Sequence, residues 1–407
     1  MALRIALLTY ATKPRGSVVH TLELADALYE LGHQPTVFAL DKDGKGFHRA
    51  VDFATYAVPA SPCDQGIDAL IKQRIGEFVD FFVELLGPHS QQYDVYHAQD
   101  CLSANALAIL RDQNYLPHFV RTVHHVESFR SPYLQDCQEK SIYLPDRCCV
   151  VSEQWQQALK REYGVVAHRV TNGVSKRFSP VKDGSELALR RDLQLGAGPI
   201  YLTVGGIEPR KNSINLLEAF ALVKRQQPTS QLIIAGGATL FDYQDYRDAF
   251  MQRYEQLVTE QPSMTNSLVL PGVIDDAQMP ALYRLADGFV FPSVKEGWGL
   301  VVLEAIASGL RVVTSDQPPF TEFLTGALVG NVAELVDPED VGAIAVAMMA
   351  SATLSHRKVE SWALGAGKIG KEKIGDRARL DLLDCYSWRR SARMHLALYE
   401  QLLSGVL

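Results

Sequence analysis

Residues 289–309 read FVFPSVKEGWGLVVLEAIASG, and this stretch decides the fold. An apolar run typical of strands ends at Pro292, and a loop with two glycines follows. Beyond the loop an apolar run of helical length contains Glu304. Proline and glycine both disfavour one continuous helix through the whole stretch. The stretch therefore predicts a strand, a glycine loop that carries Glu296, and a helix that begins near Gly299.

The same strand-and-helix unit recurs along the chain. Short apolar runs, most of them ending in Gly, Ser, Asp or His, alternate with helical patterns. Continuous apolar runs of this kind belong to parallel sheets that are covered on both faces. The strand candidates are residues 4–10, 35–40, 94–99, 119–124, 147–152 and 168–173 in the first half, and 200–206, 231–237, 267–272, 288–293, 311–316 and 333–338 in the second.

Helical patterns lie between these strand candidates. Residues 22–31 have apolar side chains at helical spacing and stop at Gly32, and residues 214–227 carry two basic residues in their last turn. Residues 387–403 read as a final amphipathic helix capped by Ser387. Strand–helix repetition in each half predicts two doubly wound α/β domains.

Length and composition agree with two globular domains. The chain has 407 residues, too many for one ordinary core, and the boundary is expected between Gly173 and Pro199. A net charge of −7 argues against a broad nucleic-acid-binding face. The first residues read as a strand rather than a signal peptide, and no apolar stretch is long enough to span a membrane. The six cysteines fit neither a zinc motif nor a disulfide framework, which predicts free thiols in a reducing cytosol.

The two carboxylates of the opening stretch flank the start of a predicted helix. The first backbone N–H groups of a helix have no partner within it and attract anions, and glycine lets a phosphate approach closely. Glu296 on one side and Glu304 on the other suit a ligand with hydroxyl groups at both ends and phosphate in the middle. A nucleotide sugar has this form. Each glutamate by itself is better explained as an exposed residue of a helix or a turn, and only the whole constellation favours the ligand site.

The motif around these glutamates resembles the signature of the retaining GT-B glycosyltransferases of family 4. The resemblance rests on residues 287–293, 296–300, 303–305 and 308–309, with two glutamates separated by seven residues. The family includes bacterial mannosyl- and glucosyltransferases and sucrose-phosphate synthases, with glycogen synthases as relatives. Further similar segments are Gly32-His33, Asn172-Gly173-Val174, Val336-Asp337-Pro338 and Ser387-Trp388.

The resemblance implies the GT-B architecture, an α/β fold of two Rossmann-like, doubly wound parallel-sheet domains facing across a cleft. Residues 1–180 would form the acceptor-binding domain and residues 181–386 the nucleotide-sugar-binding domain. Residues 387–407 would form a C-terminal helix that crosses back to the first domain.

Family resemblance also assigns roles to the residues of the opening motif. Glu296 would contact hydroxyl groups of the donor sugar, and Glu304 would bind the ribose. The backbone amides of Gly299, Leu300 and Val301 would hold the diphosphate. Val273, directly after the strand candidate at 267–272, is a further donor-binding candidate.

Residues 204–212, VGGIEPRKN, supply the expected cations. The family usually has an arginine after the first glycine and a lysine five residues later, and both hold the diphosphate leaving group. Lys211 matches the lysine, whereas Gly206 stands at the arginine position. Arg210 is the candidate replacement, although its side chain is expected to point differently from that of Lys211. A fixed ammonium group stabilises the leaving charge and can replace a metal.

In the first domain, Gly16 lies between the first strand and the first helix, where a helix start could meet donor phosphate or acceptor, and Arg15 could assist. His124 follows a strand at the place where the family commonly puts a histidine near the transferred sugar. We therefore count His124 as catalytic, together with Glu296 and Lys211. A hydrogen-bonded histidine at a strand end is the structural alternative.

The remaining polar motifs of the first domain differ in their expected roles. His97 is expected to be structural, and Asp100 is an acceptor-binding candidate. The Asp-x-Asp at Asp41–Asp43 is a metal site in transferases of another fold, but the glycine after it favours a surface turn. The apolar helix pattern at 75–86 fits core or dimer packing better than membrane docking, because its polar residues are mainly acidic.

The expected function is retaining transfer of a hexosyl group from a UDP- or GDP-sugar to a hydroxyl acceptor by front-side displacement, without a cofactor or an obligatory metal. The acceptor could be a small molecule, a glycan or a lipid-linked sugar. We expect a cytoplasmic monomer or homodimer with at most peripheral membrane contact. A glycosidase, a non-hydrolysing nucleotide-sugar epimerase and a non-catalytic nucleotide-sugar-binding protein are the alternatives.

Overall fold

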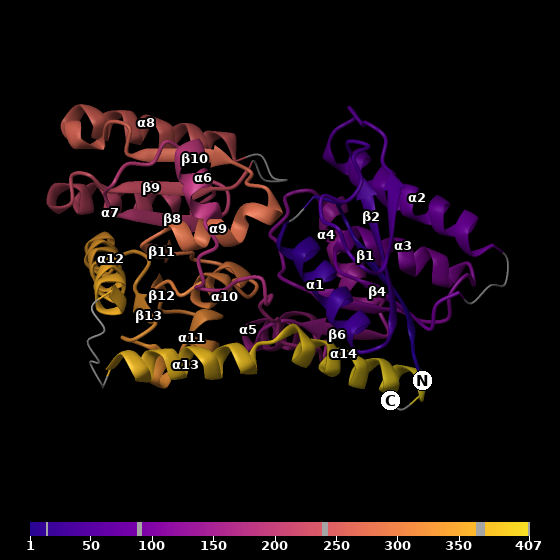
Figure 1. The fold of residues 1–407 in the computed structure, drawn as a ribbon. Coiled ribbons are helices and arrows are strands. Elements are labelled where there is room, and N and C mark those ends of the chain that lie inside the picture. Colours follow the sequence, from indigo (N-terminus) through magenta and orange to yellow (C-terminus); the bar gives the residue numbers. More distant parts are fainter. Residues whose placement is uncertain (14, 88–91, 238–242, 364–370, 406–407) are drawn as a thin grey trace. The chain divides into compact units, whose positions relative to one another are not determined.

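A computed structural model describes residues 1–13, 15–87, 92–237, 243–363 and 371–405. The chain divides into two compact units, one of Met1–Gly173 with Tyr386–Leu407 and the other of Val174–Cys385. Residues 174–180 belong to the second unit because their contacts lie there: Arg177 forms an ion pair with Asp276 at 2.6 Å. We call the two parts unit 1 and unit 2 (Figure 1).

Unit 1 is built on a seven-stranded parallel sheet in the order β3-β2-β1-β4-β5-β6-β7. Every strand predicted in the first half is present, and β3 at the sheet edge was missed. The side chains of β3 are mostly exposed or half-buried, so the strand lacks the continuous apolar run of its neighbours. The strands are β1 (Arg4–Thr9), β2 (Gln34–Asp41), β3 (Ala54–Pro59), β4 (Val95–Ala98), β5 (Val120–Val123), β6 (Arg147–Val150) and β7 (His168–Arg169).

Helices cover both faces of this sheet (Figure 1). The helix predicted at 22–31 starts earlier, at Gly16. The predicted tail helix is confirmed with its Ser387 cap, and it packs on the first helix of the same unit. The helices are α1 (Gly16–Glu30), α2 (Ile67–Leu86), α3 (Cys101–Asp112), α4 (Pro132–Tyr143), α5 (Glu153–Ala158) and α14 (Trp388–Leu403).

The apolar helix pattern of the first half packs into the core of unit 1. Ile75, Phe78, Phe82 and Leu86 of α2 lie in one buried cluster with side chains of β1, β2 and β4. The apolar face of α2 is therefore part of the hydrophobic core of unit 1. None of the helices in the described part of the chain is both long and apolar enough to cross a membrane.

Unit 2 contains a six-stranded parallel sheet in the order β10-β9-β8-β11-β12-β13, and all its strands were predicted. The strands are β8 (Ile200–Val204), β9 (Gln231–Ala235), β10 (Leu268–Gly272), β11 (Gly288–Phe291), β12 (Val312–Ser315) and β13 (Ala333–Val336). The helices are α6 (Ser185–Asp192), α7 (Ser213–Gln226), α8 (Gln244–Glu260), α9 (Met279–Leu285), α10 (Leu300–Ala307), α11 (Phe320–Phe323), α12 (Val341–Ala363) and α13 (Lys371–Cys385).

Both sheets reverse their strand order once near the middle. The reversal lies between β1 and β4 in unit 1 and between β8 and β11 in unit 2. Ligands of open parallel sheets bind beyond the carboxyl ends of the strands at this switch point. The predicted pair of doubly wound parallel-sheet domains is confirmed, and each unit has one place where a site is expected.

Candidate active site

The switch point of unit 2 brings two of the predicted motifs together. The chain leaves β8 through Gly205 and forms a short 3₁₀-helix over Pro209–Lys211, while the loop after β11 leads to α10. Gly205 has φ +143°, and a Cβ atom there would lie 3.1 Å from Cε of Lys211. A glycine therefore lets the lysine side chain run closely over the end of the strand.

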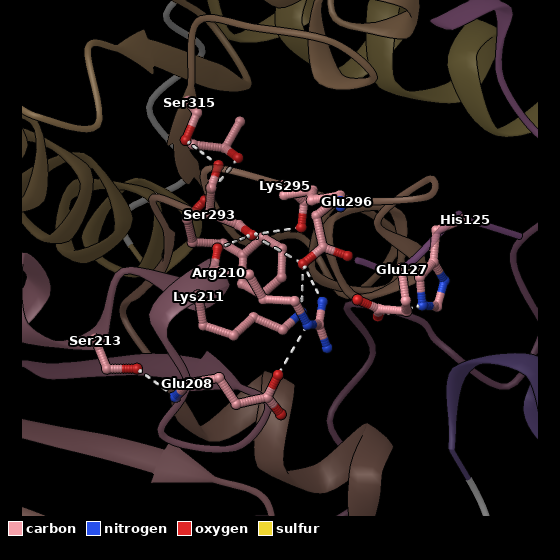
Figure 2. Close-up of polar contacts among 12 residues, drawn as sticks. His125, Glu127, Glu208, Arg210, Lys211, Ser213, Ser293, Lys295, Glu296 and Ser315 are labelled. Atoms are coloured by element: carbon pink, nitrogen blue, oxygen red, sulfur yellow. Dashed lines mark hydrogen bonds and ion pairs between the residues drawn. The ribbon is translucent and has the colours of Figure 1, made fainter. Parts of the chain in front are cut away.

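Three predicted residues meet in one ionic cluster (Figure 2). Nζ of Lys211 lies 2.5 Å and Nη1 of Arg210 lies 3.0 Å from the same oxygen, Oε1 of Glu296. The expectation that the side chain of Arg210 points differently from that of Lys211 is wrong, because both reach the same oxygen. Both side chains are long enough to reach across the switch point, where Glu296 attracts them and Glu208 holds Nε of Arg210 at 2.8 Å.

Hydroxyl groups fix the loop that carries Glu296. Ser293 donates to Oε1 of Glu296 at 2.9 Å and also lies 2.7 Å from the carbonyl oxygen of Arg210. Ser315, at the end of β12, donates to the carbonyl oxygen of Ser293 at 2.7 Å. The sequence did not single out Ser293, because a serine after a strand usually marks only a turn. Its position directly after Pro292 was the available signal.

The cluster carries charge although it is largely enclosed. Only 13% of the Lys211 side chain and 10% of the Glu296 side chain are exposed. Burial acts to raise the pKa of Glu296, but Lys211 and Arg210 outweigh it and bring that pKa below its usual value. Burial lowers the pKa of Lys211, and Glu296 opposes that shift. Glu296 is therefore ionised at neutral pH and keeps a cation beside it.

The helix start predicted near Gly299 is confirmed. Gly299 has φ +93°, and α10 begins at Leu300. A Cβ atom on Gly299 would lie 2.6 Å from Cε1 of Phe320, so both the backbone conformation and the space require glycine. The amides of Gly299, Leu300 and Val301 thus belong to a first helical turn, where backbone N–H groups have no intrahelical acceptor.

Glu304 lies in the second turn of α10, as predicted, and has a partner that the sequence did not reveal. The hydroxyl of Tyr283 in α9 donates to Oε2 of Glu304 at 2.7 Å. Burial and the carboxylate raise the pKa of Tyr283 well above its usual value, so the phenol remains a donor. Tyr283 holds one oxygen of Glu304 in a fixed position.

The other donor-binding candidates lie along the same edge of the unit 2 sheet. Gly206 is half-buried in the loop after β8. Val273 follows β10 and is 73% exposed. A Cβ atom on Gly237, after β9, would lie 2.6 Å from Cγ2 of Val273, which places Val273 directly beside the end of the neighbouring strand.

In unit 1, Gly16 is the first residue of α1, and Arg15 is its N-cap. Gly16 is exposed, and a Cβ atom there would meet nothing within 4 Å. The helix start is therefore accessible, and glycine is not required there by the fold of unit 1.

The Asp-x-Asp forms a turn as expected: Asp41 accepts from the amide of Gly46 at 2.9 Å, and Asp43 pairs with Lys13 at 2.7 Å.

His124 follows β5 and is half-buried in a polar cluster. Its Nε2 lies 3.3 Å from Oε1 of Gln99, and its ring meets the ring of His20 edge-on, with centroids 4.7 Å apart. Burial first, and then the charge of His20, lower the pKa of His124 well below its usual value, so the imidazole is neutral. A neutral imidazole both donates and accepts hydrogen bonds, as contact with a sugar hydroxyl requires.

The neighbouring polar residues have structural partners. His97 is fully buried, and its ring nitrogens lie 2.7 Å from the hydroxyl of Tyr399 and 2.8 Å from Oγ1 of Thr122. Its expected structural role is confirmed. His125 is exposed and pairs with Glu127 at 2.8 Å. Asp100 caps α3 by accepting from the amide of Ser103 at 2.9 Å.

Comparison with known families assigns each half of the chain. Residues 187–356 match the family model described as glycosyl transferases group 1, and residues 14–177 match the model described as glycosyltransferase family 4. The O-antigen chain mannosyltransferase B of Escherichia coli is 28% identical over 253 residues. That match covers 58% of this chain and 63% of the relative, less than two thirds of the relative's length.

Solved structures share the fold over the whole chain. Sucrose-phosphate synthase from Thermosynechococcus elongatus has a TM-score of 0.73 and 23% identity, covering 99% of this chain and all of the other. A protein of Anabaena solved in complex with UDP and glucose has a TM-score of 0.70 and 18% identity, covering 100% of both chains. At these identities the likeness concerns the fold.

Proposed function

The chain belongs to the GT-B glycosyltransferases, with a group 1 second half and a family 4 first half, and on this basis we propose that it moves a hexosyl group from a nucleotide sugar to a hydroxyl acceptor with retention. The observation that carries the proposal is the meeting of Lys211, Arg210 and Glu296 at the switch point of unit 2. Two cations and an ionised carboxylate here are suited to the phosphate and the sugar of one donor.

In the proposed reaction, Lys211 and Arg210 bind the diphosphate and Glu296 accepts hydrogen bonds from hydroxyl groups of the donor sugar. The amides at the start of α10 hold the remaining phosphate oxygens, and Glu304, fixed by Tyr283, accepts from the ribose. Arg210 then provides the second positive charge that Gly206 does not. Each of these contacts lies on a strand end or a helix start, where the backbone itself holds the side chain in place.

The chemical step breaks the bond between the anomeric carbon and the diphosphate oxygen, and the electron pair leaves with the diphosphate. The acceptor oxygen attacks from the same face, and its proton passes to the departing phosphate oxygen. The two cations stabilise the leaving charge more in the transition state than in the bound donor. We propose that they do so without an obligatory metal, and that neutral His124 contacts the transferred sugar.

The sugar and the base remain those of a UDP- or GDP-hexose. The relatives named as a mannosyltransferase and a sucrose-phosphate synthase, and the Anabaena protein in complex with UDP and glucose, support hexose donors. The acceptor is a small molecule, a glycan or a lipid-linked sugar.

A thermal-shift and hydrolysis screen tests the proposal. UDP-glucose, GDP-mannose, ADP-glucose and UDP-N-acetylglucosamine are each added to the protein, with and without EDTA. One of them should raise the melting temperature and be hydrolysed slowly in both conditions. Lys211→Ala and Glu296→Gln should lose turnover, whereas Lys182→Ala, at an exposed position of unit 2, should not.

Two outcomes would replace the proposal. Formation of a second sugar isomer without any acceptor would identify an epimerase. Tight donor binding without hydrolysis, and without transfer to any acceptor supplied, would identify a binding protein. Full turnover in both Lys211→Ala and Glu296→Gln would reject the mechanism but not the family.

A further inference from the structure

Polar and charged side chains gather at the switch point of unit 1, and two of them, Asp100 and Arg121, have buried atoms without a hydrogen-bond partner among the described residues. Four residues from adjacent strands, β2, β1, β4 and β5 in spatial order, contribute to it: Tyr10 and Lys42 follow β1 and β2, Asp100 follows β4, and Arg121 lies within β5. The resemblance to known transferases assigned no role to Tyr10, Lys42 or Arg121.

Arg121 is the most unusual member of this group. It is 6% exposed, and no described residue accepts a hydrogen bond from its Nε or Nη1 atoms. Burial lowers its pKa, and Asp100 is the strongest of the groups that oppose the shift. Two buried guanidinium nitrogens without an acceptor are costly, and a bound anion would remove that cost.

Asp100 interacts with both cations of the group. Its Oδ1 atom caps α3, but its buried Oδ2 atom has no donor in the part of the chain that the structure describes. Burial raises the pKa of Asp100, while Arg121 and Lys42 both act to lower it. Asp100 therefore offers one free carboxylate oxygen to a hydroxyl or amide donor close to both cations.

Lys42 supplies the second cation, at an exposed position. Its ammonium lies 5.0 Å from the centre of the Tyr10 ring. Burial, followed by the charge of Arg74, lowers the pKa of Lys42 to about 8. Besides Asp100, the acids near it are already engaged: Asp43, the next residue, pairs with Lys13 at 2.7 Å, and Glu77 pairs with Arg74 at 2.6 Å.

The local charge is opposite in sign to that of the whole chain. The chain as a whole has a net charge of −7. The charged groups that interact at the switch point of unit 1 are nevertheless four cations and two carboxylates, namely Arg15, Lys42, Arg74, Arg121, Glu77 and Asp100. An anion would therefore be attracted by this site and not by the protein as a whole.

We propose that Lys42 and Arg121 bind the anionic group of a phosphate- or carboxylate-bearing acceptor, and that Asp100 accepts a hydrogen bond from one of its hydroxyl groups. This inference rests on the proposed function, because it names the class of molecule that receives the sugar. A guanidinium and an ammonium that share one carboxylate fit a charged sugar better than a neutral one, since a neutral sugar brings no anion for the second cation.

Calorimetry without any nucleotide sugar measures the acceptor site alone. The ligands are inorganic phosphate, glucose 6-phosphate, glucuronate and glucose, in a zwitterionic buffer at low salt. Glucose 6-phosphate or glucuronate should bind at least tenfold more tightly than glucose, and the better of the two identifies the anion. Lys42→Ala should weaken that binding about tenfold, whereas Lys45→Ala, an exposed lysine of the same loop, should not. Equal binding of glucose and both charged sugars would reject the proposal.

Arg121→Met separates a ligand-binding arginine from a structural one. The substitution removes a buried charge that lacks acceptors at Nε and Nη1, so the ligand-free protein should melt at the same or a higher temperature while anion binding is lost. A lower melting temperature with unchanged anion binding would show that Arg121 is structural and would overturn its assignment. Lys42→Ala still tests the site if Arg121→Met does not fold.

Donor hydrolysis in the absence of acceptor reports on the proposed function independently. If the wild-type protein hydrolyses a nucleotide sugar but binds no charged sugar through Lys42 and Arg121, the acceptor inference falls and the transferase proposal stands. If charged sugars bind through these residues but no donor is turned over, the site stands as an anion site and the transfer proposal falls.

Discussion

The ammonium group of Lys211 and the carboxylate of Glu296 lie 2.5 Å apart, and both side chains are largely buried. In the ligand-free protein each therefore serves as the counter-ion of the other. In the proposed reaction, a donor that brings its own diphosphate charge would compete with Glu296 for Lys211 and leave the carboxylate available to sugar hydroxyl groups. The pair would thus link binding of the phosphate to binding of the sugar.

Removing the ammonium should affect catalysis more than folding. Lys211→Ala should reduce turnover roughly 100-fold or more, the usual effect of losing one group that stabilises transition-state charge. The loss of unfolding free energy should stay below the roughly 3–5 kcal/mol typical of a broken buried pair, because Arg210 remains on Glu296. Hydrolysis rates and urea unfolding test both effects. An activity loss explained entirely by unfolding would contradict this expectation.

Gly299→Ala should destabilise unit 2 and weaken donor binding. The left-handed backbone at φ +93° costs an L-residue roughly 1–2 kcal/mol, and the new methyl group would also collide with Phe320, 2.6 Å away. Gly326→Ala is the matched control, since it has φ +57° and nothing within 4 Å. The melting temperature should fall further in Gly299→Ala than in the control. An equal fall in both would mean that Phe320 moves aside.

Gly16→Ala should leave stability unchanged but reduce transfer. A Cβ atom at this position meets nothing within 4 Å, and alanine favours a helix more than glycine does. If a ligand approaches the start of α1, the methyl group should cost roughly tenfold in kcat/KM, or about 1.4 kcal/mol. Thermal melting and steady-state kinetics measure the two effects separately. Unchanged kinetics would remove Gly16 from the site.

Acid should destabilise unit 1 through its buried histidines. Burial lowers the pKa of His20 to about 3 and that of His395 to about 4, whereas an unfolded histidine titrates near 6.5. Between the folded and the unfolded pKa values, the unfolded chain binds more protons than the folded one. The free energy of unfolding is therefore greatest above about pH 6.5 and declines as the pH falls. Each of these two groups should approach a slope of about 1.4 kcal/mol per pH unit, and the buried His97 and His124, whose pKa values are also lowered, add to it.

Urea unfolding from pH 7 to pH 5 measures this slope. Trp388 is a suitable fluorescent probe, because its ring lies 5.2 Å from that of His20. His395→Leu should reduce the slope by about 1.4 kcal/mol per pH unit, and His48→Asn, at an exposed position, should not change it. The same slope in all three proteins would mean that other groups cause the acid sensitivity.

Binding of a charged sugar to unit 1 should weaken as the pH rises through about 8. Lys42 is protonated below its pKa of about 8, and the anion loses that cation above it. The other groups that act on Lys42 are Arg74, Asp100, Arg15 and Glu77. Calorimetry with glucose 6-phosphate at pH 7 and pH 9 tests the effect. Lys42→Arg should remove the pH dependence because arginine stays charged.

The sequence predicted best the strands that form continuous apolar runs. All twelve predicted strands exist, because a continuous apolar run admits few other structures. The edge strand β3 was missed because its exposed side chains give no such run. The start of α1 was placed too late, since its first turns contain β-branched residues and His20, which is buried among polar groups rather than in an apolar stripe.

The candidate site was predictable where a motif fixes the backbone. The glycine loop and the helix start after it follow from Gly299, because only glycine fits the backbone conformation and the space at this position. The direction of Arg210 was not predictable, because it depends on the position of Glu296, 86 residues away. Ser293 and Tyr283 were missed for a similar reason. The sequence does not show whether a hydroxyl group bonds to a carboxylate of the site or lies on the surface.

The assignment of α14 to unit 1 has a consequence for synthesis of the protein. His97 in β4 bonds to Tyr399 in α14, 302 residues later, so unit 1 gains its last helix only after all of unit 2 has left the ribosome. Unit 2 is continuous in sequence and has every strand of its sheet before then. The part of the chain that is translated first is therefore the part that completes its fold last, and its polar histidine cluster stays open to water until that final helix docks.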